Sequence, residues 1–248
     1  MIVDETLLIA HRFCGPPSSG NGGYVAGALA ERLSSAPGEA VTVSLRHPPP
    51  LDVPMEVIVV DGVATLSRGG SVIATAAIAQ ATIDPVEPVS YDEAVSASRS
   101  YPGLANHPFP TCFSCGTDRT DGLRIFPGPV DPGPGGTARA ATPWTPDATI
   151  AGADGQQASL AATWAALDCS GGWAGGELTG RMMVLARMTA IIDELPRIGE
   201  PHVAMGQKLG EDGRKTITAS TLHDSDGRVV GRAEHLWVAV DPALFGRA

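Results

Sequence analysis

The chain has 248 residues and a formal net charge of −10, with 17 lysines and arginines against 27 aspartates and glutamates. An acidic chain without a basic run lacks the face that nucleic acid or an anionic membrane surface requires, so both are excluded as expected partners. No apolar stretch reaches the roughly 18 residues that a membrane-spanning helix needs, so we expect no membrane span.

The first predicted elements are a strand, a glycine-rich loop and a helix. An apolar run favours a strand at 4–13, and either Ser19 or Asn21 is a suitable N-cap for the helix after the loop. This helix is predicted to continue to about Leu33, where a Ser-Ser-Ala-Pro-Gly segment stops it. Alternating apolar and polar residues then predict strands, each with one buried face, at 41–46, 55–60, 64–67 and 72–79.

The periodic pattern is lost over residues 85–135, which are rich in proline and glycine. Five aromatic residues lie in this stretch, and a flexible tether has little use for them. We interpret it as a connection that packs over the surface of the protein.

A second series of elements begins near residue 136. It comprises a short strand at 138–141, a helix at about 156–169 that Gly171-Gly172 is expected to end, and then further strands. The alternating pattern is clearest in the last three of these strands, which are predicted to form an antiparallel meander. The predicted strands after the helix are 184–192, 202–209, 215–223 and 229–240.

A helix of small residues followed by a meander thus occurs twice. The sequences GGYVAGALAE and SLAATWAALD both end in a carboxylate, and small residues allow a sheet to curl closely around a helix. The pattern favours an α+β protein with a double hotdog arrangement, in which two long central helices are each wrapped by a curved antiparallel sheet. The alternative is an ordinary α+β protein with alanine-rich helices. The predicted divisions are 1–84 and 136–248 for the two halves and 85–135 for the connection.

Several segments support this interpretation by resemblance. Residues 20–26 read GNGGYVA and residues 41–50 read VTVSLRHPPP; both segments resemble the N-terminal half of the acyl-CoA thioesterase II-like, double hotdog proteins. The TWAALDC segment at 163–169 resembles the central helix of other hotdog thioesterases. The CFSCGTDRTDGLRI segment at 112–125 resembles one that often precedes a hotdog domain.

The resemblance implies hydrolysis of an acyl thioester. Enzymes of this family use a hydroxyl and a glutamine together with an aspartate, and Thr189 and Gln207 lie on the right kind of strand to be candidates. The chain departs from related patterns in its second half, where Gln156-Gln157-Ala158 replaces a glycine pair.

Asp168 is the candidate base for activating water. It follows nine small or apolar residues, so it is predicted to lie late on a buried helix, where a carboxylate is costly unless it is paired or protonated. The alternative is a polar residue that faces solvent at the end of the helix.

Backbone N–H groups at a helix N-terminus can polarise the thioester carbonyl, because they lack partners and lie at the positive end of the helix dipole. The alternative is that the glycines only allow the helix to pack tightly. The candidate oxyanion and substrate-binding residues are Asn21, Gly22, Gly23 and Tyr24.

Glu31 is the pseudo-equivalent carboxylate of the first half. If the two helices run antiparallel, Asp168 faces residues 21–23 and Glu31 faces residues 156–158. Only the first pairing joins a glycine-flanked helix start to a buried acid, so we expect one competent site in each chain and keep Glu31 as a weaker candidate.

The four cysteines are too scattered for a disulfide framework, which favours a reducing, cytoplasmic setting. Cys112 and Cys115 have the spacing of half a zinc site, but no second pair follows. Packing under the connection is therefore preferred to zinc, and we expect neither a metal nor a cofactor. Cys14, Cys169 and His107 would have to converge from distant segments to complete a site.

The leading hypothesis is a thioesterase that acts on an acyl-CoA or a related acyl thioester. The alternatives are a non-catalytic module that binds acyl thioesters and, less favoured, an enoyl-thioester hydratase or dehydratase. The last chemistry brings a histidine next to the aspartate, and His107 lies in the connection, far from both helix starts. Two halves in one chain make either a monomer or a homodimer feasible.

Overall fold

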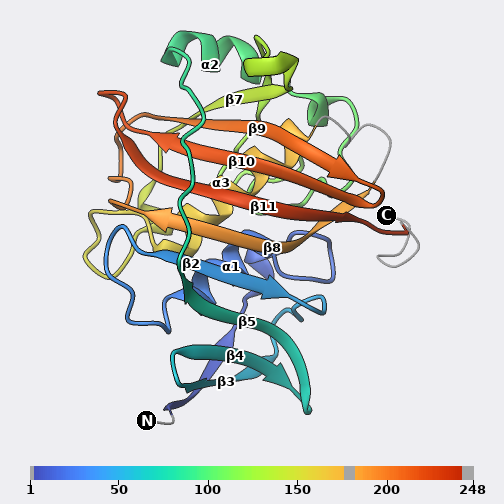
Figure 1. Ribbon diagram of the computed structural model, residues 1–248, viewed down its shortest axis with the longest axis vertical. Coiled ribbons are helices and arrows are strands. Elements are labelled where there is room, and N and C mark those ends of the chain that lie inside the picture. Colours follow the sequence, from blue (N-terminus) through green and yellow to red (C-terminus); the bar gives the residue numbers. More distant parts are fainter. Residues whose placement is uncertain (1–2, 176–181, 242–248) are drawn as a thin grey trace.

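The computed structural model describes residues 3–175 and 182–241. They form one antiparallel sheet of eleven strands in the order β1-β3-β4-β5-β2-β8-β11-β10-β9-β7-β6 (Figure 1). The strands are β1 (Val3–Leu8), β2 (Ala40–Leu45), β3 (Pro54–Val60), β4 (Val63–Arg68), β5 (Ser71–Ala79), β6 (Gly128–Val130), β7 (Arg139–Trp144), β8 (Met183–Ile192), β9 (His202–Asp212), β10 (Lys215–His223) and β11 (Val229–Ala239). The α-helices are α1 (Gly22–Ala30), α2 (Tyr91–Ser98) and α3 (Leu160–Ala174).

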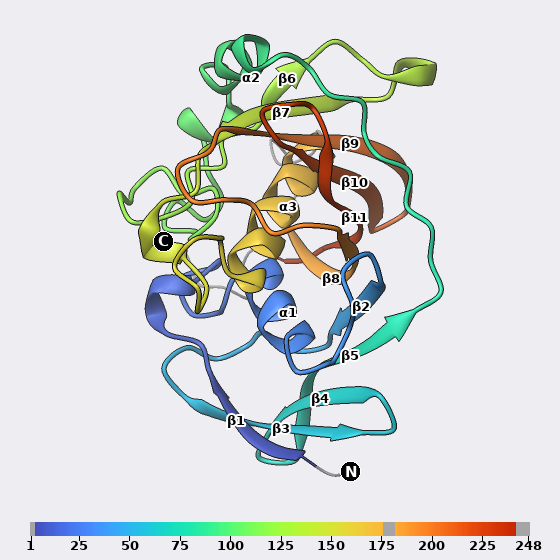
Figure 2. The same cartoon turned by 90° about the vertical axis from the view of Figure 1, so that its left-hand side faces the viewer.

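Helices α1 and α3 lie side by side within the curve of the sheet (Figure 2). They approach closely because glycines of α1 face α3. A Cβ on Gly23 would lie 2.4 Å from the Cβ of Asp168, and one on Gly27 would lie 2.7 Å from the Cα of Ala161. Position 23 thus lies beside position 168 and position 27 beside position 161, so the two helices run antiparallel.

The alternation in the sequence reflects the two faces of the sheet. In β2, Val41 and Val43 are buried, whereas Thr42 between them is half-buried. The strands predicted from this alternation are present, and β10 has the predicted bounds. The predicted antiparallel meander is confirmed in the pairing of β9, β10 and β11.

Several predicted boundaries are wrong. The first strand ends at Leu8 rather than residue 13, because the next segment turns into a 3-10 helix (His11–Phe13) whose first N–H donates to Asp52. The second helix begins at Leu160, capped by Ser159, and passes through Gly171-Gly172 to Ala174. Those two glycines do not stop the helix, since they allow it to pack tightly against β11.

The first helix ends at Ala30 and not at Leu33.

The connection after β5 contains α2, which the sequence analysis did not predict, and α2 packs on β6, β7 and β9. Before α2, the chain crosses the face of the sheet that points away from α1 and α3 (Figures 1 and 2). The divisions 1–84, 85–135 and 136–248 stay a prediction.

None of the helices in the described ranges combines the length and the apolar character needed to cross a bilayer.

Candidate active site

Asp168 lies on α3 against the N-terminus of α1 and is only 2% exposed. Its Oδ2 accepts a hydrogen bond from the backbone N–H of Gly23 at 2.9 Å and faces the side-chain amide of Asn21 at 3.4 Å. Its Oδ1 has no hydrogen-bond partner among the described residues. One carboxylate oxygen is therefore fixed by hydrogen bonds, while the other is buried without a partner among these residues.

Burial raises the pKa of Asp168 to about 7, since desolvation disfavours the carboxylate. The hydrogen bonds from Gly23 and Asn21 oppose this shift, whereas the nearby Cys112 adds to it. A carboxyl group with a pKa near neutrality suits proton transfer in both directions.

Asn21 joins the start of α1 to this carboxylate. Its Oδ1 caps the helix by accepting from the N–H of Tyr24 at 2.8 Å, and its Nδ2 points toward Asp168. The N-cap is thus Asn21, the second of the two residues that the sequence analysis considered.

The two helix-start glycines differ in what they contact. The N–H of Gly23 is occupied by Asp168, so it positions the carboxylate. The N–H of Gly22 has no acceptor within the described part of the chain, and Gly22 lines a cavity. Of the two amides predicted to polarise a carbonyl, only that of Gly22 is free to do so.

Tyr24 points elsewhere. Its ring stacks on Phe13 with centroids 3.9 Å apart and meets the edge of Phe113. Burial raises the pKa of Tyr24 to about 12, and the residue does not line the cavity. The structure thus places Tyr24 in the packing around α1, away from the space beside Asp168.

A cavity of about 320 Å³ opens beside Asp168 and Gly22. Its walls are mainly apolar and come from α3, β8 and β11, with Met183, Leu185 and Trp237 as large contributors. The segment after β2, with Arg46 and His47, forms part of the rim, and both residues are exposed. An apolar cavity that opens past the guanidinium of Arg46 suits a ligand with an apolar tail and an anionic head.

The connection completes the wall of the cavity. Cys112, Cys115 and His107 from this segment line it together with Cys169 from α3. Sequence reasoning did not place the three residues of the connection in the site, because they lie more than 50 residues from Asp168 along the chain. The available signal was the Cys-x-x-Cys-Gly motif, which indicates a fixed loop turn rather than a linker.

No protein-family model matches the sequence, and no curated protein matches it. Solved structures match nearly the whole chain. A conserved protein with a hot dog fold from Alicyclobacillus acidocaldarius matches with a TM-score of 0.64 at 12% identity, covering 97% of this chain and 94% of that one. This chain has the hotdog fold.

Two further matches over nearly the whole chain are named a tesB protein and an acyl-CoA thioesterase II. The tesB protein of Mycobacterium avium subs paratuberculosis matches with a TM-score of 0.64 at 12% identity, covering 96% of this chain and 93% of that one. The acyl-CoA thioesterase II TesB2 of Mycobacterium marinum matches with a TM-score of 0.62 at 14% identity, covering 97% and 94%. The resemblance to thioesterase II-like hotdog proteins is thereby confirmed for the fold.

The opposite end of the α1–α3 pair in this hotdog fold holds Glu31. Its carboxylate accepts hydrogen bonds from the N–H groups of Leu160 and Ala161 at the start of α3, and partial desolvation raises its pKa. The predicted antiparallel facing is therefore present, shifted by a few residues because α3 begins at Leu160. Glu31 is exposed and is not among the residues that line the cavity beside Asp168.

The hotdog sheet keeps Thr189 and Gln207 away from this cavity. The hydroxyl of Thr189 on β8 bonds to that of Thr42 on β2 at 2.8 Å, and the amide of Gln207 on β9 donates to Thr137 at 2.8 Å. Neither residue is among those that line the cavity. The structure brings together Asp168, Asn21 and the two glycines, but not Thr189, Gln207 or Glu31.

Proposed function

We propose that this protein hydrolyses acyl thioesters, with acyl-CoA as the expected substrate, at one site centred on Asp168. The observation that carries the proposal is the buried carboxylate itself, which is anchored through one oxygen, has the other free, and lies at the wall of an apolar cavity. The thioesterase names of similar folds support it, although fold similarity alone does not decide a reaction.

The proposed reaction uses the free Oδ1 of Asp168 as the general base. A water bound there transfers a proton to Asp168 as its oxygen attacks the carbonyl carbon, and the N–H of Gly22 stabilises the oxyanion. When the carbon–sulfur bond breaks, the leaving thiol takes the proton from Asp168. The products are a carboxylic acid and a free thiol, and Asp168 returns to its starting state.

We further propose that the fold is a double hotdog. In this interpretation β1–β5 wrap α1, β6–β11 wrap α3, and the two halves join through the pairing of β2 with β8. The inequality of the two helix ends supports a single competent site, because only one end has a buried acid next to a cavity.

His107 does not support a hydratase reaction, although it lines the same cavity. Its Nδ1 accepts from the N–H of Phe109 at 2.9 Å, so its Nε2 carries the proton and donates to the carbonyl of Cys115 at 3.0 Å. Burial also lowers the pKa of His107. With both nitrogens engaged, the ring holds a loop and does not exchange protons with a ligand.

The test is release of free thiol from acyl-CoAs of several chain lengths by the wild type, Asp168→Asn and Glu31→Gln. Loss of the general base is expected to lower kcat roughly 10²- to 10⁴-fold in Asp168→Asn. Glu31→Gln, the matched carboxylate-to-amide control, is expected to keep wild-type turnover. Thermal unfolding of each variant shows whether it is folded.

Equal losses in the two variants would contradict the single site. Tight acyl-CoA binding without turnover in the wild type would instead indicate a binding module. With an enoyl-CoA as the substrate, loss of the enoyl absorbance without thiol release would instead indicate hydration.

A further inference from the structure

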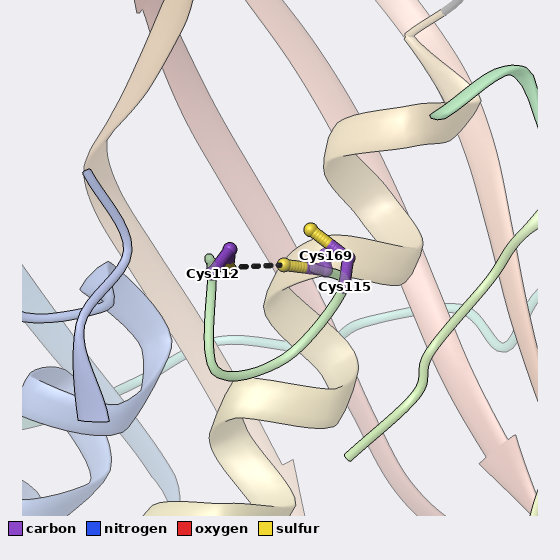
Figure 3. Close-up of side chains that lie close together, drawn as sticks. All are labelled: Cys112, Cys115 and Cys169. Atoms are coloured by element: carbon purple, nitrogen blue, oxygen red, sulfur yellow. Dashed lines mark hydrogen bonds between the residues drawn. The ribbon is translucent and has the colours of Figure 1, made fainter. Parts of the chain in front are cut away.

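Three thiols from two distant segments meet at the cavity wall. Cys112 and Cys115 come from the connection and Cys169 from α3, and their sulfur atoms all lie within 4.8 Å of one another (Figure 3). The sulfurs of Cys112 and Cys169 are 4.0 Å apart. All three residues are buried, and all are free thiols. The convergence that the sequence analysis required for a metal site has therefore occurred for Cys169.

The loop that carries the first two thiols is held rigidly. The N–H groups of Ser114 and Cys115 point at the sulfur of Cys112, and the N–H of Gly116 donates to the carbonyl of Cys112 at 2.8 Å. A Cβ at Gly116 would lie 2.5 Å from that carbonyl oxygen, so this turn needs glycine. The hydroxyl of Ser114 ties the loop to α3 by donating to the carbonyl of Ala165 at 2.7 Å.

A side-chain N–H donor faces two of the three sulfurs. The Nδ2 group of Asn21 lies 3.6 Å from the sulfur of Cys112 and 4.0 Å from that of Cys169, so an N–H donor faces both. Burying an anion is costly unless a positive charge compensates it.

We propose that Cys112, Cys115 and Cys169 form a binding site for a thiophilic divalent metal ion of the zinc class, with its fourth coordination position open to the cavity. A zinc–sulfur distance of about 2.3 Å places the sulfurs of a tetrahedral site roughly 3.8 Å apart, close to the 4.0 Å between the sulfurs of Cys112 and Cys169. The spacing of Cys112 and Cys115 is also typical of zinc ligands.

Among the described residues, no fourth histidine, cysteine or carboxylate joins the three sulfurs. His107 is the nearest histidine in sequence to the loop, and both of its nitrogens are already engaged. Three protein ligands with an open position are typical of zinc sites that bind an exchangeable water or ligand. On binding, each sulfur that is still a thiol releases its proton to solvent, and neither sulfur nor metal changes oxidation state.

The test uses the full chain, purified with a reductant, stripped with a chelator and titrated with Co²⁺ and then Zn²⁺. Co²⁺ is expected to bind with one equivalent, to give a sulfur-to-cobalt charge-transfer band and tetrahedral d–d bands, and to be displaced by Zn²⁺. Cys112→Ser, Cys115→Ser and Cys169→Ser are expected to lose the band and to bind Zn²⁺ far more weakly, beyond the roughly 10- to 100-fold cost of losing an outer-shell partner. Cys14→Ser is the matched control, because Cys14 is also buried but lies outside the cluster.

A second measurement does not depend on the variants folding. One equivalent of Zn²⁺ is expected to protect three of the four cysteines of the wild type from alkylation, as counted by mass. Absence of the cobalt band, unchanged alkylation, or an equal loss in Cys14→Ser would overturn the proposal, and so would a Cys112–Cys169 disulfide that persists in reductant. These readouts do not require thioester turnover, so failure of the proposed hydrolysis would leave them unaffected.

Discussion

The backbone N–H of Gly23 and the carboxylate of Asp168 are joined by a 2.9 Å hydrogen bond between residues 145 positions apart in the chain. This bond links the start of α1 to the middle of α3, beside the cavity that Gly22 and Asp168 line. A glycine is needed there, since any Cβ would overlap the Cβ of Asp168. The same glycine therefore sets the packing of the helices and the position of the acid.

Gly23→Ala is expected to damage both stability and turnover. The added methyl group would lie 2.7 Å from the carbonyl oxygen of Trp164 as well as against Asp168, and overpacking of this kind costs roughly 1–3 kcal/mol. Gly210→Ala is the control, because no atom lies within 4 Å of a Cβ placed there. Chemical denaturation and thiol release measure the two effects, and wild-type behaviour of Gly23→Ala would contradict the close approach.

Asn21→Ser separates capping from carboxylate binding. Serine can still cap α1, so Asn21→Ser is expected to keep the capping contribution of about 1 kcal/mol that Asn21→Ala loses. Both variants lack the amide that faces Asp168, and a hydrogen bond to a charged group contributes about 1.5–3 kcal/mol, so kcat is expected to fall roughly tenfold or more.

Ser159→Ala, which removes only the cap of α3, provides the comparison for Asn21. It is expected to lower stability without the loss in kcat. If turnover followed stability alone across the three variants, Asn21 would have no role beyond the cap.

His235 is expected to make the protein less stable in mild acid. It is fully buried, with Nδ1 near Thr218, and burial lowers its pKa to about 4 from 6.5. Above pH 6.5 the imidazole is neutral in both states and has no effect. Between pH 6.5 and 4 only the unfolded chain binds the proton, so the free energy of unfolding falls by up to roughly 3 kcal/mol, and below pH 4 the loss is constant.

Urea unfolding of the wild type and His235→Gln at several pH values isolates this contribution, because glutamine does not titrate. The wild type and His235→Gln are expected to differ in the slope of the free energy of unfolding against pH only between pH 6.5 and 4. His11→Gln, at an exposed position, is expected to follow the wild type. If this slope were the same for all three proteins, His235 would bind its proton equally well in the folded and unfolded states.

Arg46 at the rim of the cavity is expected to bind the phosphates of CoA. Arg46→Glu should raise KM for acyl-CoA roughly fivefold, as expected for about 1 kcal/mol at an exposed site, and should leave KM for the matching acyl-pantetheine unchanged. Arg99→Glu provides the charge-matched control, since Arg99 is exposed at the end of α2. Equal effects on both substrates would place the CoA phosphates elsewhere.

The strands could be predicted from the sequence because one face of the sheet is buried, as Val41 and Val43 show beside Thr42. The end of α3 could not be predicted from local rules, because Gly171 and Gly172 serve the approach of His235 and Trp237 rather than a turn. The helix α2 was missed although Ser90 and Glu93 form its capping box, because the surrounding segment is rich in proline and glycine.

The candidate site was only partly predictable. Asp168 could be singled out because a carboxylate after nine small or apolar residues has a cost that local packing does not explain. The occupied amide of Gly23, the free amide of Gly22 and the meeting of Cys112 with Cys169 all depend on which segments the fold brings together. Thr189 was chosen by its strand, and a strand position alone does not say which side of the sheet a side chain occupies.

The segment between β5 and β6 supplies His107, Cys112 and Cys115 to a cavity whose other walls come from α3, β8, β11 and the segment after β2. A ligand in this cavity would contact all of these segments at once, and its binding free energy would add to the free energy of unfolding of the protein. Folding and the binding of such a ligand are therefore thermodynamically linked, and none of these segments would form the cavity on its own.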